Sequence, residues 1–204
     1  MIYPTREQEN KDFEDSSIRY IGGIDEAGRG PVAGPVVVAI VVLGRDHEQI
    51  TKIRDSKTLS EKQREELFGE IISLKNIAWS FGYGTVSMID KHGIMYAINR
   101  ATVTAFQKLS IKPDICLTDG NLTGFDFKYR CFSKGDRDIY VISMASVIAK
   151  VVRDRAMKEY DKRYPDYGFG QHKGYGTKMH YERIKEFGLC DIHRRSYIEG
   201  CGGS

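Results

Sequence analysis

The 204-residue sequence has little of what zinc-binding, secreted and membrane proteins depend on. Its four cysteines (Cys116, Cys131, Cys190 and Cys201) form no CxxC pair, and its five histidines form no HExxH pattern, which argues against a zinc site. No apolar region follows a basic start, and no apolar run approaches the length that spans a bilayer. We therefore expect a reduced, cytoplasmic protein.

The composition is that of one well-cored domain, with 41% hydrophobic and 29% charged residues. The net charge of +3 and the pI near 8.6 are only mildly basic, so they agree with a nucleic-acid partner without requiring one. Residues 128–163 hold more Lys and Arg than Asp and Glu. This excess is explained equally well by a nucleic-acid surface and by a solvated helix face.

The segment at residues 21–43 contains two apolar stretches around a polar, glycine-rich turn. Residues 36–43 are almost all β-branched, which predicts a strand buried on both faces, and residues 19–24 predict a shorter strand before the turn. Asp25 and Glu26 then follow at a strand end. Because adjacent strand residues point to opposite faces, these acids share one site only if the backbone bends or one of them contributes its carbonyl.

The glycines after these acids fit no nucleotide-binding fingerprint. Gly28, Gly30 and Gly34 have a last gap that is one residue too long for the dinucleotide motif, and no Gly-Lys-Ser/Thr follows for a nucleoside triphosphate loop. The segment is then either an ordinary turn or a loop whose bare amides approach a ligand. With Arg29 and two carboxylates beside it, the second interpretation suggests phosphate and a divalent metal.

The remaining elements are predicted from periodicity and caps. Ser60 and Gln63 form a capping box for a helix that ends near Leu74, with a buried face of Leu67, Phe68, Ile71, Ile72 and Leu74. Strands are expected at residues 77–85, 115–118 and 128–132, and helices at 93–109, where Ala97, Ala101 and Ala105 allow close packing, at 140–162 and at 177–187. We divide the chain into a loose leader or weak helix (1–17), a catalytic domain with a C-terminal helical extension (18–198) and a flexible tail (199–204).

Three further acids are candidates, and each has an ordinary explanation. Asp119 ends a predicted strand and precedes Gly120, as in many turns. Asp136 lies just before the long helix, where an acid favours the helix N-terminus. Asp154 is spaced i,i+4 from Lys150 and from Lys158, so an ion pair explains it and we rank it below Asp136 as a ligand.

Two other residues are ambiguous from sequence alone. Lys57 precedes the capped helix and is either a surface lysine or a phosphate contact. Tyr175 lies between Gly174 and Gly176, and an isolated tyrosine is more often part of a core or a surface patch. The flanking glycines favour an exposed ring.

Five separated motifs together resemble the bacterial ribonuclease HII family, or type 2 ribonuclease H. They are GIDEAGRGPVAGPV, DSKTLS, TDG, KGD followed by SMASVIAKVVRD, and HKGYGTKMH, in this order and at this spacing. The resemblance covers about residues 19–197. Met144-Ala145-Ser146 stands where the family has an alanine-rich segment, and the Gly-Arg-Gly and the lack of a type 3 N-terminal domain favour type 2.

The resemblance implies an α/β ribonuclease H-like fold: a mixed five-stranded sheet, its first three strands antiparallel, flanked by helices and followed by a C-terminal helical extension. It implies that Asp25, Glu26, Asp119 and Asp136 are the catalytic and metal-binding carboxylates and that Asp154 supports them. Clustered carboxylates suit Mg²⁺ or Mn²⁺, and two such ions about 4 Å apart activate water and neutralise a leaving oxyanion.

The resemblance also implies the substrate contacts. The backbone of Gly28, Arg29 and Gly30 would recognise the 2′-hydroxyl, the group that separates ribose from deoxyribose. Tyr175 would pack on the deoxyribose that follows the ribonucleotide. Lys57 and Ser146 would contact phosphates.

The implied activity is endonucleolytic hydrolysis on the 5′ side of ribonucleotides, which leaves 5′-phosphate and 3′-hydroxyl ends. The expected partners are RNA–DNA hybrids and duplex DNA containing single ribonucleotides, with no membrane and with the protein as a monomer. Two alternatives stay open: another two-metal nuclease on the same fold, and a non-catalytic nucleic-acid binding module. The first leaves Gly-Arg-Gly and Tyr175 unexplained, and loss of a metal acid would favour the second.

Overall fold

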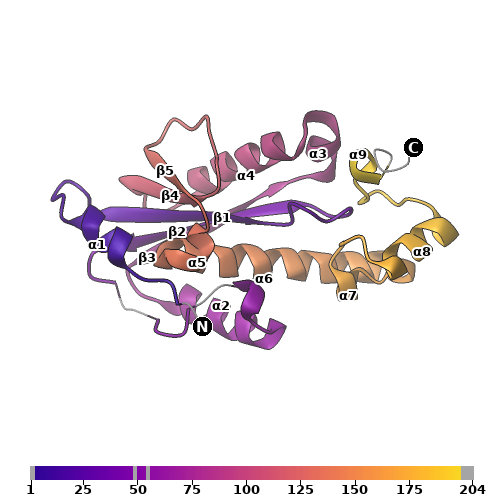
Figure 1. Cartoon of the computed structure of the whole chain (residues 1–204), viewed down its shortest axis with the longest axis horizontal. Helices are drawn as coiled ribbons and strands as arrows, with labels where there is room; N and C mark the ends of the chain where they lie inside the picture. Colours follow the sequence, from indigo (N-terminus) through magenta and orange to yellow (C-terminus); the bar gives the residue numbers. More distant parts are fainter. Residues whose placement is uncertain (1–2, 48–49, 54–55, 199–204) are drawn as a thin grey trace.

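The computed structural model describes residues 3–47, 50–53 and 56–198, without the side chain of Lys57. A five-stranded sheet with the order β3-β2-β1-β4-β5 forms its centre (Figure 1). The strands are β1 (Tyr20–Ala27), β2 (Val36–Gly44), β3 (Ile77–Gly84), β4 (Ile115–Asp119) and β5 (Tyr129–Phe132). The first three are antiparallel, and β4 and β5 run parallel to β1 and β4 respectively. The predicted mixed sheet is therefore confirmed.

Helices cover both faces of this sheet (Figure 1). They are α1 (Glu7–Phe13), α2 (Glu61–Ser73), α3 (Val86–His92), α4 (Ile94–Lys108), α5 (Gly135–Asp138), α6 (Tyr140–Arg163), α7 (Phe169–His172), α8 (Lys178–Phe187) and α9 (Arg195–Ile198), with 3₁₀ turns at Ser56–Thr58 and Pro165–Tyr167. Figure 1 shows α3 and α4 on one face and α2 and α6 on the other. None of the described helices is long and apolar enough to cross a membrane.

Strand β2 separates two hydrophobic cores. Val37, Ala39 and Val41 pack with α2 and α6, whereas Val36, Val38, Ile40 and Val42 pack with α4. Successive strand residues alternate between faces, so a strand covered on both sides is apolar throughout. Full burial of each such side chain contributes about 1.5–3 kcal/mol. This confirms the doubly covered strand predicted at residues 36–43.

Small residues let two helices lie directly on the sheet. Ala97 and Ala101 of α4 are fully buried, and a Cβ at Gly84 or Gly82 would overlap their carbonyl groups. On the other face, a Cβ at Gly23 of β1 would overlap the backbone of Val141 in α6. Helix α6 therefore packs against the backbone of β1 at Gly23, two residues before Asp25.

Three local predictions are wrong in detail. Strand β1 continues to Ala27, so the acids lie within a strand and no bend separates them. Helix α3 is a short element that periodicity did not reveal, and Thr85, expected in a strand, caps it by accepting the N–H of Met88. The capping box at Ser60 is confirmed, but Ile72 is exposed instead of buried because it lies on the outer side of α2.

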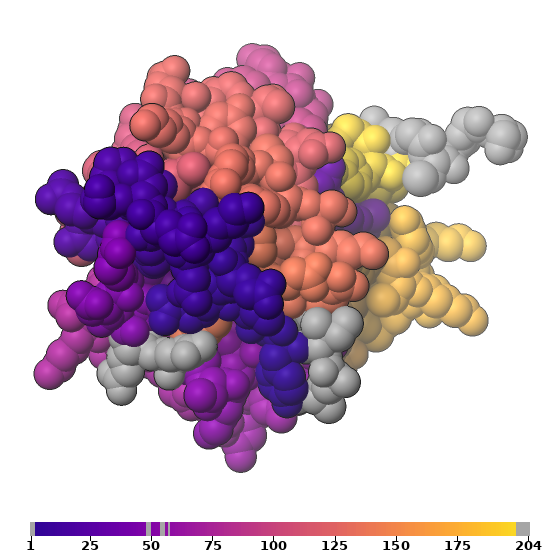
Figure 2. Space-filling model, turned by 60° about the vertical axis from the view of Figure 1, so that its left-hand side comes forward, coloured from indigo at the N-terminus to yellow at the C-terminus, as the bar shows by residue number. Residues whose placement is uncertain are grey.

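Within residues 3–17 the N-terminal segment forms helix α1, which is the helical alternative to a loose leader. Helix α1 lies against the body of the molecule (indigo in Figure 2), and Phe13 joins the core beneath the sheet. The fully buried carboxyl group of Glu9 accepts the N–H of Val141 at 2.8 Å, and Thr5 O accepts that of Tyr140 at 3.1 Å. Both donors belong to the first turn of α6, whose N–H groups have no partner within the helix. The predicted tail at 199–204 lies outside the described residues.

The C-terminal helical extension has a core of its own, built from Ala33, Met157, Tyr167, Phe169 and Ile192. It comprises α7, α8 and α9 and sits at the end of the sheet beyond β1 and β2 (Figure 1). Main-chain hydrogen bonds tie it to the glycine-rich loop after β1, including Val32 N to Gly174 O at 2.9 Å and Arg194 N to Val32 O at 2.8 Å. The extension is thus part of one packed unit with that loop.

Three buried histidines support the segment that carries Tyr175. His180 Nδ1 lies 2.9 Å from Tyr175 O and must donate, because a carbonyl only accepts. His180 Nε2 then accepts from His193 Nε2 at 3.0 Å, and His193 Nδ1 accepts from Cys190 N at 2.9 Å.

His172 follows the same logic: its Nε2 donates to Tyr167 O, and its Nδ1 accepts from Gly174 N. Each neutral ring therefore has one tautomer fixed by its partners, and an added proton on any of the three would face a donor.

These contacts predict a loss of stability in acid. Burial lowers the pKa of His180 and of His193 from 6.5 to about 4, so both stay neutral in the folded protein while the unfolded chain takes up protons below about pH 6.5. The free energy of unfolding contributed by these rings is present above pH 6.5 and is lost as the pH falls toward 4. Urea unfolding should therefore have a lower midpoint at pH 5 than at pH 7.5.

The His193→Gln variant should show a smaller difference between the two midpoints, because it removes one of the titrating rings. His92→Gln, at an exposed histidine, is the matched control and should keep the wild-type difference. If the difference between the urea midpoints at pH 5 and pH 7.5 were the same in His193→Gln and wild type, His193 would not contribute to the loss of stability in acid.

Candidate active site

A cleft of about 320 Å³ opens where β1 and β4 end. Most of the site residues predicted from sequence line it: Asp25, Glu26, Gly28, Arg29, Gly30, Asp119, Ser146 and Tyr175. Ser56 and Lys150 line it as well, and neither was predicted to do so. The candidates therefore come together from strands, two loops and helix α6.

Strand register explains how two of the acids meet. Strands β1 and β4 are parallel, and Ile24 pairs with Thr118, so Asp25 and Asp119 follow on neighbouring strands at the same edge. Glu26 also lines the cleft, although it follows Asp25 directly in an unbroken strand. Asp25 Oδ1 accepts the N–H of Glu26 at 2.8 Å, which turns the Asp25 carboxylate along the strand.

Asp136 is held next to this edge by the main chain of its own helix. Gly135 N donates to Asp119 Oδ1 at 2.7 Å, which joins the start of α5 to the end of β4. Asp136 is the next residue and is only 6% exposed. It is not among the residues that line the cleft, but it lies close enough to act on the charge of Asp25.

The carboxylates repel one another strongly. Burial raises the pKa of Asp25 well above its ordinary value, and the charges of Glu26, Asp119 and Asp136 raise it further, whereas a hydrogen bond from Ser146 lowers it. Three acids thus act on the buried carboxyl group of Asp25. A cation placed among them would favour the ionised form.

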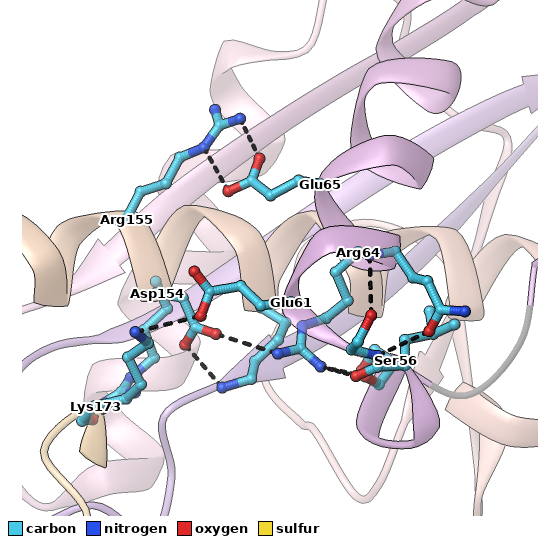
Figure 3. Close-up of polar contacts among 12 residues, drawn as sticks. Ser56, Glu61, Arg64, Glu65, Asp154, Arg155 and Lys173 are labelled. Carbon is cyan, nitrogen blue, oxygen red and sulfur yellow. Dashed lines mark hydrogen bonds and ion pairs between the residues drawn. The ribbon is translucent and has the colours of Figure 1, made fainter. Parts of the chain in front are cut away.

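Asp154 belongs to a separate ion-pair network beside the cleft (Figure 3). It is 4% exposed and accepts from Lys150 Nζ at 2.7 Å, with Arg64 Nη2 at 3.7 Å. Lys150 is confirmed as a partner, but Lys158 pairs with Glu61 instead. In Figure 3 the guanidinium of Arg64 lies between Asp154 and Ser56, whose carbonyl it bonds. Asp154 therefore fixes Lys150 at the cleft and is not itself on the cleft wall.

Ser146 has two protein partners. Its hydroxyl lies 2.9 Å from that of Ser56 and also bonds Asp25, and its side chain is nearly buried. These contacts orient the Asp25 carboxylate from the side of α6. The prediction that Lys57 contacts phosphate concerns a side chain outside the described residues.

The two glycines around Arg29 differ in their surroundings. Gly28 has φ +101°, and a Cβ there would overlap the side chain of Arg153. Gly30 has open space where its Cβ would be. The Arg29 side chain is half-exposed, with Nη1 3.4 Å from Glu26 Oε1. Gly28 is thus required by packing, while Gly30 faces the space in front of the cleft.

Tyr175 stands at the edge of the cleft and is 46% exposed. Gly174 has φ +80°, and a Cβ there would overlap Ala33 O, so the segment lies tightly on the glycine-rich loop. The guanidinium carbon of Arg153 is 6.0 Å from the ring centroid. The exposed ring predicted from the flanking glycines is what the structure has.

Comparison with known proteins identifies the family. The family model described as Ribonuclease HII matches residues 22–199. Among curated relatives, a ribonuclease HII of Caldicellulosiruptor bescii is 47% identical over 182 residues, covering 89% of this chain and 87% of that protein. One of Clostridioides difficile is 44% identical over 192 residues, covering 94% and 74%.

A solved structure agrees with these sequence matches. The crystal structure of the ribonuclease H2 from Pyrococcus horikoshii OT3 superposes with a TM-score of 0.71 at 28% identity, covering 88% of this chain and 96% of that one. The fold, the converging acids and the sequence matches lead to the same conclusion. The chain belongs to the ribonuclease HII family.

Proposed function

We propose that this endoribonuclease hydrolyses the phosphodiester on the 5′ side of ribonucleotides, in RNA–DNA hybrids and at single ribonucleotides within duplex DNA. The observation that carries the proposal is the composition of the cleft. It is lined by the acids Asp25, Glu26 and Asp119 and also by Gly28, Arg29, Gly30 and Tyr175. Acids suited to phosphate chemistry and a loop suited to sugar recognition thus face the same space.

The donor set fits divalent metal ions, Mg²⁺ or Mn²⁺. Asp25, Glu26, Asp119 and Asp136 offer only carboxylate oxygens, the ligands that these hard cations prefer. Among the described residues, no three Asp, Glu, His or Cys side chains are grouped closely enough to hold a metal ion, so the fit rests on donor type and charge. The raised pKa of Asp25 agrees with this fit, because a bound cation offsets both the burial and the repulsion that disfavour the ionised carboxylate. When bound, such ions lower the pKa of water and neutralise the leaving oxyanion.

The protein's own groups orient the acids. Asp119 is fixed by Gly135 N, and Asp25 by Glu26 N and Ser146. Lys150, its side chain 21% exposed and held by Asp154, adds a positive charge at the cleft. We propose that Lys150 and Ser146 meet the scissile phosphate and that Asp154 acts through Lys150.

Sugar recognition falls to the loop and to Tyr175. The 2′-hydroxyl is the one group that distinguishes ribose, and main-chain amides reach it only where no side chain intervenes, as at Gly30. The exposed face of Tyr175 suits a deoxyribose on the 3′ side, since an added 2′-hydroxyl would crowd it. All these residues come from one chain, which supports action as a monomer on nucleic acid. A cytoplasmic setting and roles in DNA replication and repair stay predictions.

The proposal is tested on duplex DNA that carries one ribonucleotide. With Mg²⁺ or Mn²⁺ the protein should cut on the 5′ side of that ribonucleotide and leave a 3′-hydroxyl that a DNA polymerase extends. Asp136→Asn should lower turnover roughly 10²–10³-fold, because it removes one anionic group with little change of shape. Asp154→Asn should lower it by less than about ten-fold, because Asp154 acts only through Lys150.

The circular dichroism spectrum and the affinity for the duplex should be the same for Asp136→Asn and wild type. Equal turnover of Asp136→Asn and Asp154→Asn in saturating Mn²⁺ would show that the fourth acid is wrongly assigned. Equal cutting of an all-DNA duplex would contradict the proposed substrate.

Substitutions at Gly28 and Gly30 test the role of packing and the role of ligand approach separately. Gly30→Ala should leave the free energy of unfolding within about 0.5 kcal/mol of wild type, because its Cβ meets nothing, but should lower kcat/KM about ten-fold by blocking the ribose. Gly28→Ala should lower stability markedly, since its φ is positive and Arg153 occupies the space. Thermal unfolding and kcat/KM, measured on both variants, distinguish a loss of stability from a loss of substrate recognition. Wild-type kcat/KM in Gly30→Ala would refute the backbone contact.

Tyr175→Ala should lose about ten-fold to a hundred-fold in kcat/KM on a single embedded ribonucleotide. Aromatic contacts with nucleic acid are worth about 1–3 kcal/mol, and each 1.4 kcal/mol is tenfold. The loss should be smaller on an all-RNA strand paired with DNA. Tyr175→Phe should retain most junction activity, because the ring face makes the contact. If Tyr175→Ala lowered kcat/KM by the same factor on both substrates, the proposal that Tyr175 recognises the ribose-to-deoxyribose junction would have to be dropped.

A further inference from the structure

Two arginines lie buried behind the glycine-rich loop. Arg194 is 0% exposed and Arg153 is 1% exposed, which is rare for a charged residue unless its donors are satisfied. Each makes three hydrogen bonds to main-chain carbonyl groups. Their burial is thus tied to the main chain of the loop.

Arg194 bonds two adjacent carbonyls, those of Gly28 and Arg29, in the glycine-rich loop at residues 28–34. Its Nη2 donates to Gly28 O at 2.6 Å and its Nη1 to Arg29 O at 3.1 Å, while Nε donates to Gly34 O at 2.9 Å. Tyr197 Oη also donates to Arg29 O, at 3.1 Å. One rigid guanidinium therefore fixes both peptide planes that flank Arg29.

Fixing a carbonyl also fixes the N–H that follows it. In a trans peptide the C=O of one residue and the N–H of the next point in opposite directions across one plane. The peptide between Lys173 and Gly174 shows this arrangement: its carbonyl accepts from Arg153, and its N–H donates to His172 Nδ1 on the opposite side. With Gly28 O and Arg29 O turned inward, the N–H groups of Arg29 and Gly30 point outward.

These two amides face the cleft, which Gly28, Arg29 and Gly30 line. Across the described residues, neither N–H donates to a protein acceptor in a hydrogen bond. A cation at the carbonyl end of each peptide also polarises it and makes its N–H a stronger donor. The result is a pair of adjacent donors presented to whatever enters the cleft.

We propose that Arg194 is a positioning residue for ribose recognition, which aims the amides of Arg29 and Gly30 at the 2′-hydroxyl by holding Gly28 O and Arg29 O. The proposal rests on the proposed function, in which that loop recognises the hydroxyl. It assigns no contact between Arg194 and the substrate.

Arg153 extends the arrangement to the second recognition element. Its Nε and Nη2 donate to Pro35 O at 3.0 Å and Ala33 O at 3.2 Å, and its Nη1 donates to Lys173 O at 3.0 Å. It also lies under the Tyr175 ring. Burial lowers the pKa of Arg153 to about 10, so it stays cationic at neutral pH. Arg153 therefore holds the glycine-rich loop and the segment that carries Tyr175 in a fixed position relative to each other.

The test compares binding to two duplexes in Ca²⁺, without turnover: one with a single ribonucleotide and one of DNA only. The ratio of the two Kd values measures recognition of the hydroxyl and does not change with the folded fraction. Arg194→Gln should reduce this ratio about five-fold to ten-fold. Arg195→Gln removes the same charge one position away, at an exposed residue, and should keep the wild-type ratio.

An unchanged ratio in folded Arg194→Gln would overturn the proposal. If that variant does not fold, Arg194→Lys decides, since lysine keeps the positive charge but lacks the planar fork that bonds Gly28 O and Arg29 O together. A reduced ratio would support the proposal, and a wild-type ratio would overturn it. Failure of the proposed function itself is seen separately, as a wild-type ratio of one or no cleavage in Mg²⁺.

Discussion

The active-site architecture depends on direct contact between helix α6 and strand β1. Residue 23 has no side chain, and the backbone of Val141 occupies the space that a Cβ would need. At this separation Ser146 and Lys150, one turn apart on α6, reach the cleft that Asp25 lines. The segment before α6 carries Asp136 and bonds Asp119 through Gly135. A larger residue at 23 would move all of these groups together relative to Asp25.

Charge is sorted around this contact. Asp25 and Glu26 of β1 and Asp119 of β4 lie at one edge of the sheet with Asp136 beside them in α5, and burial together with their mutual repulsion raises the pKa of Asp25. The cations surround them: Lys150 lines the cleft and is held by Asp154, whereas Arg153 and Arg194 are buried behind the glycine-rich loop and held by main-chain carbonyls. Buried charges are costly unless each is paired or hydrogen-bonded, and here the pairing also fixes loop geometry. The charges that stabilise the fold thus lie next to those that line the cleft.

The sequence predicted what local patterns encode. The apolar run of β2, the capping box at Ser60 and the alanines of α4 each carry a periodic or cap signal, and the acids stand in recognisable motifs. Partners far apart in sequence were not predictable. Nothing marks Glu9 as the carboxylate that caps α6, because its role depends on a contact 132 residues away. Helix α3 spans only seven residues, too few for helical periodicity to show. Arg153 and Arg194 resemble any basic residue until folding brings carbonyls to them.

The bond from Arg194 to Gly28 O joins residues 166 positions apart. A ribosome adding about 5–20 residues per second makes Gly28 roughly 8 to 30 s before Arg194. During that interval the strands and α6 can form, but the carbonyls of Gly28 and Arg29 have no guanidinium to orient them. The loop that is synthesised among the first elements therefore acquires its final shape among the last. On the proposed function, it would distinguish ribose from deoxyribose only when the C-terminal extension has docked.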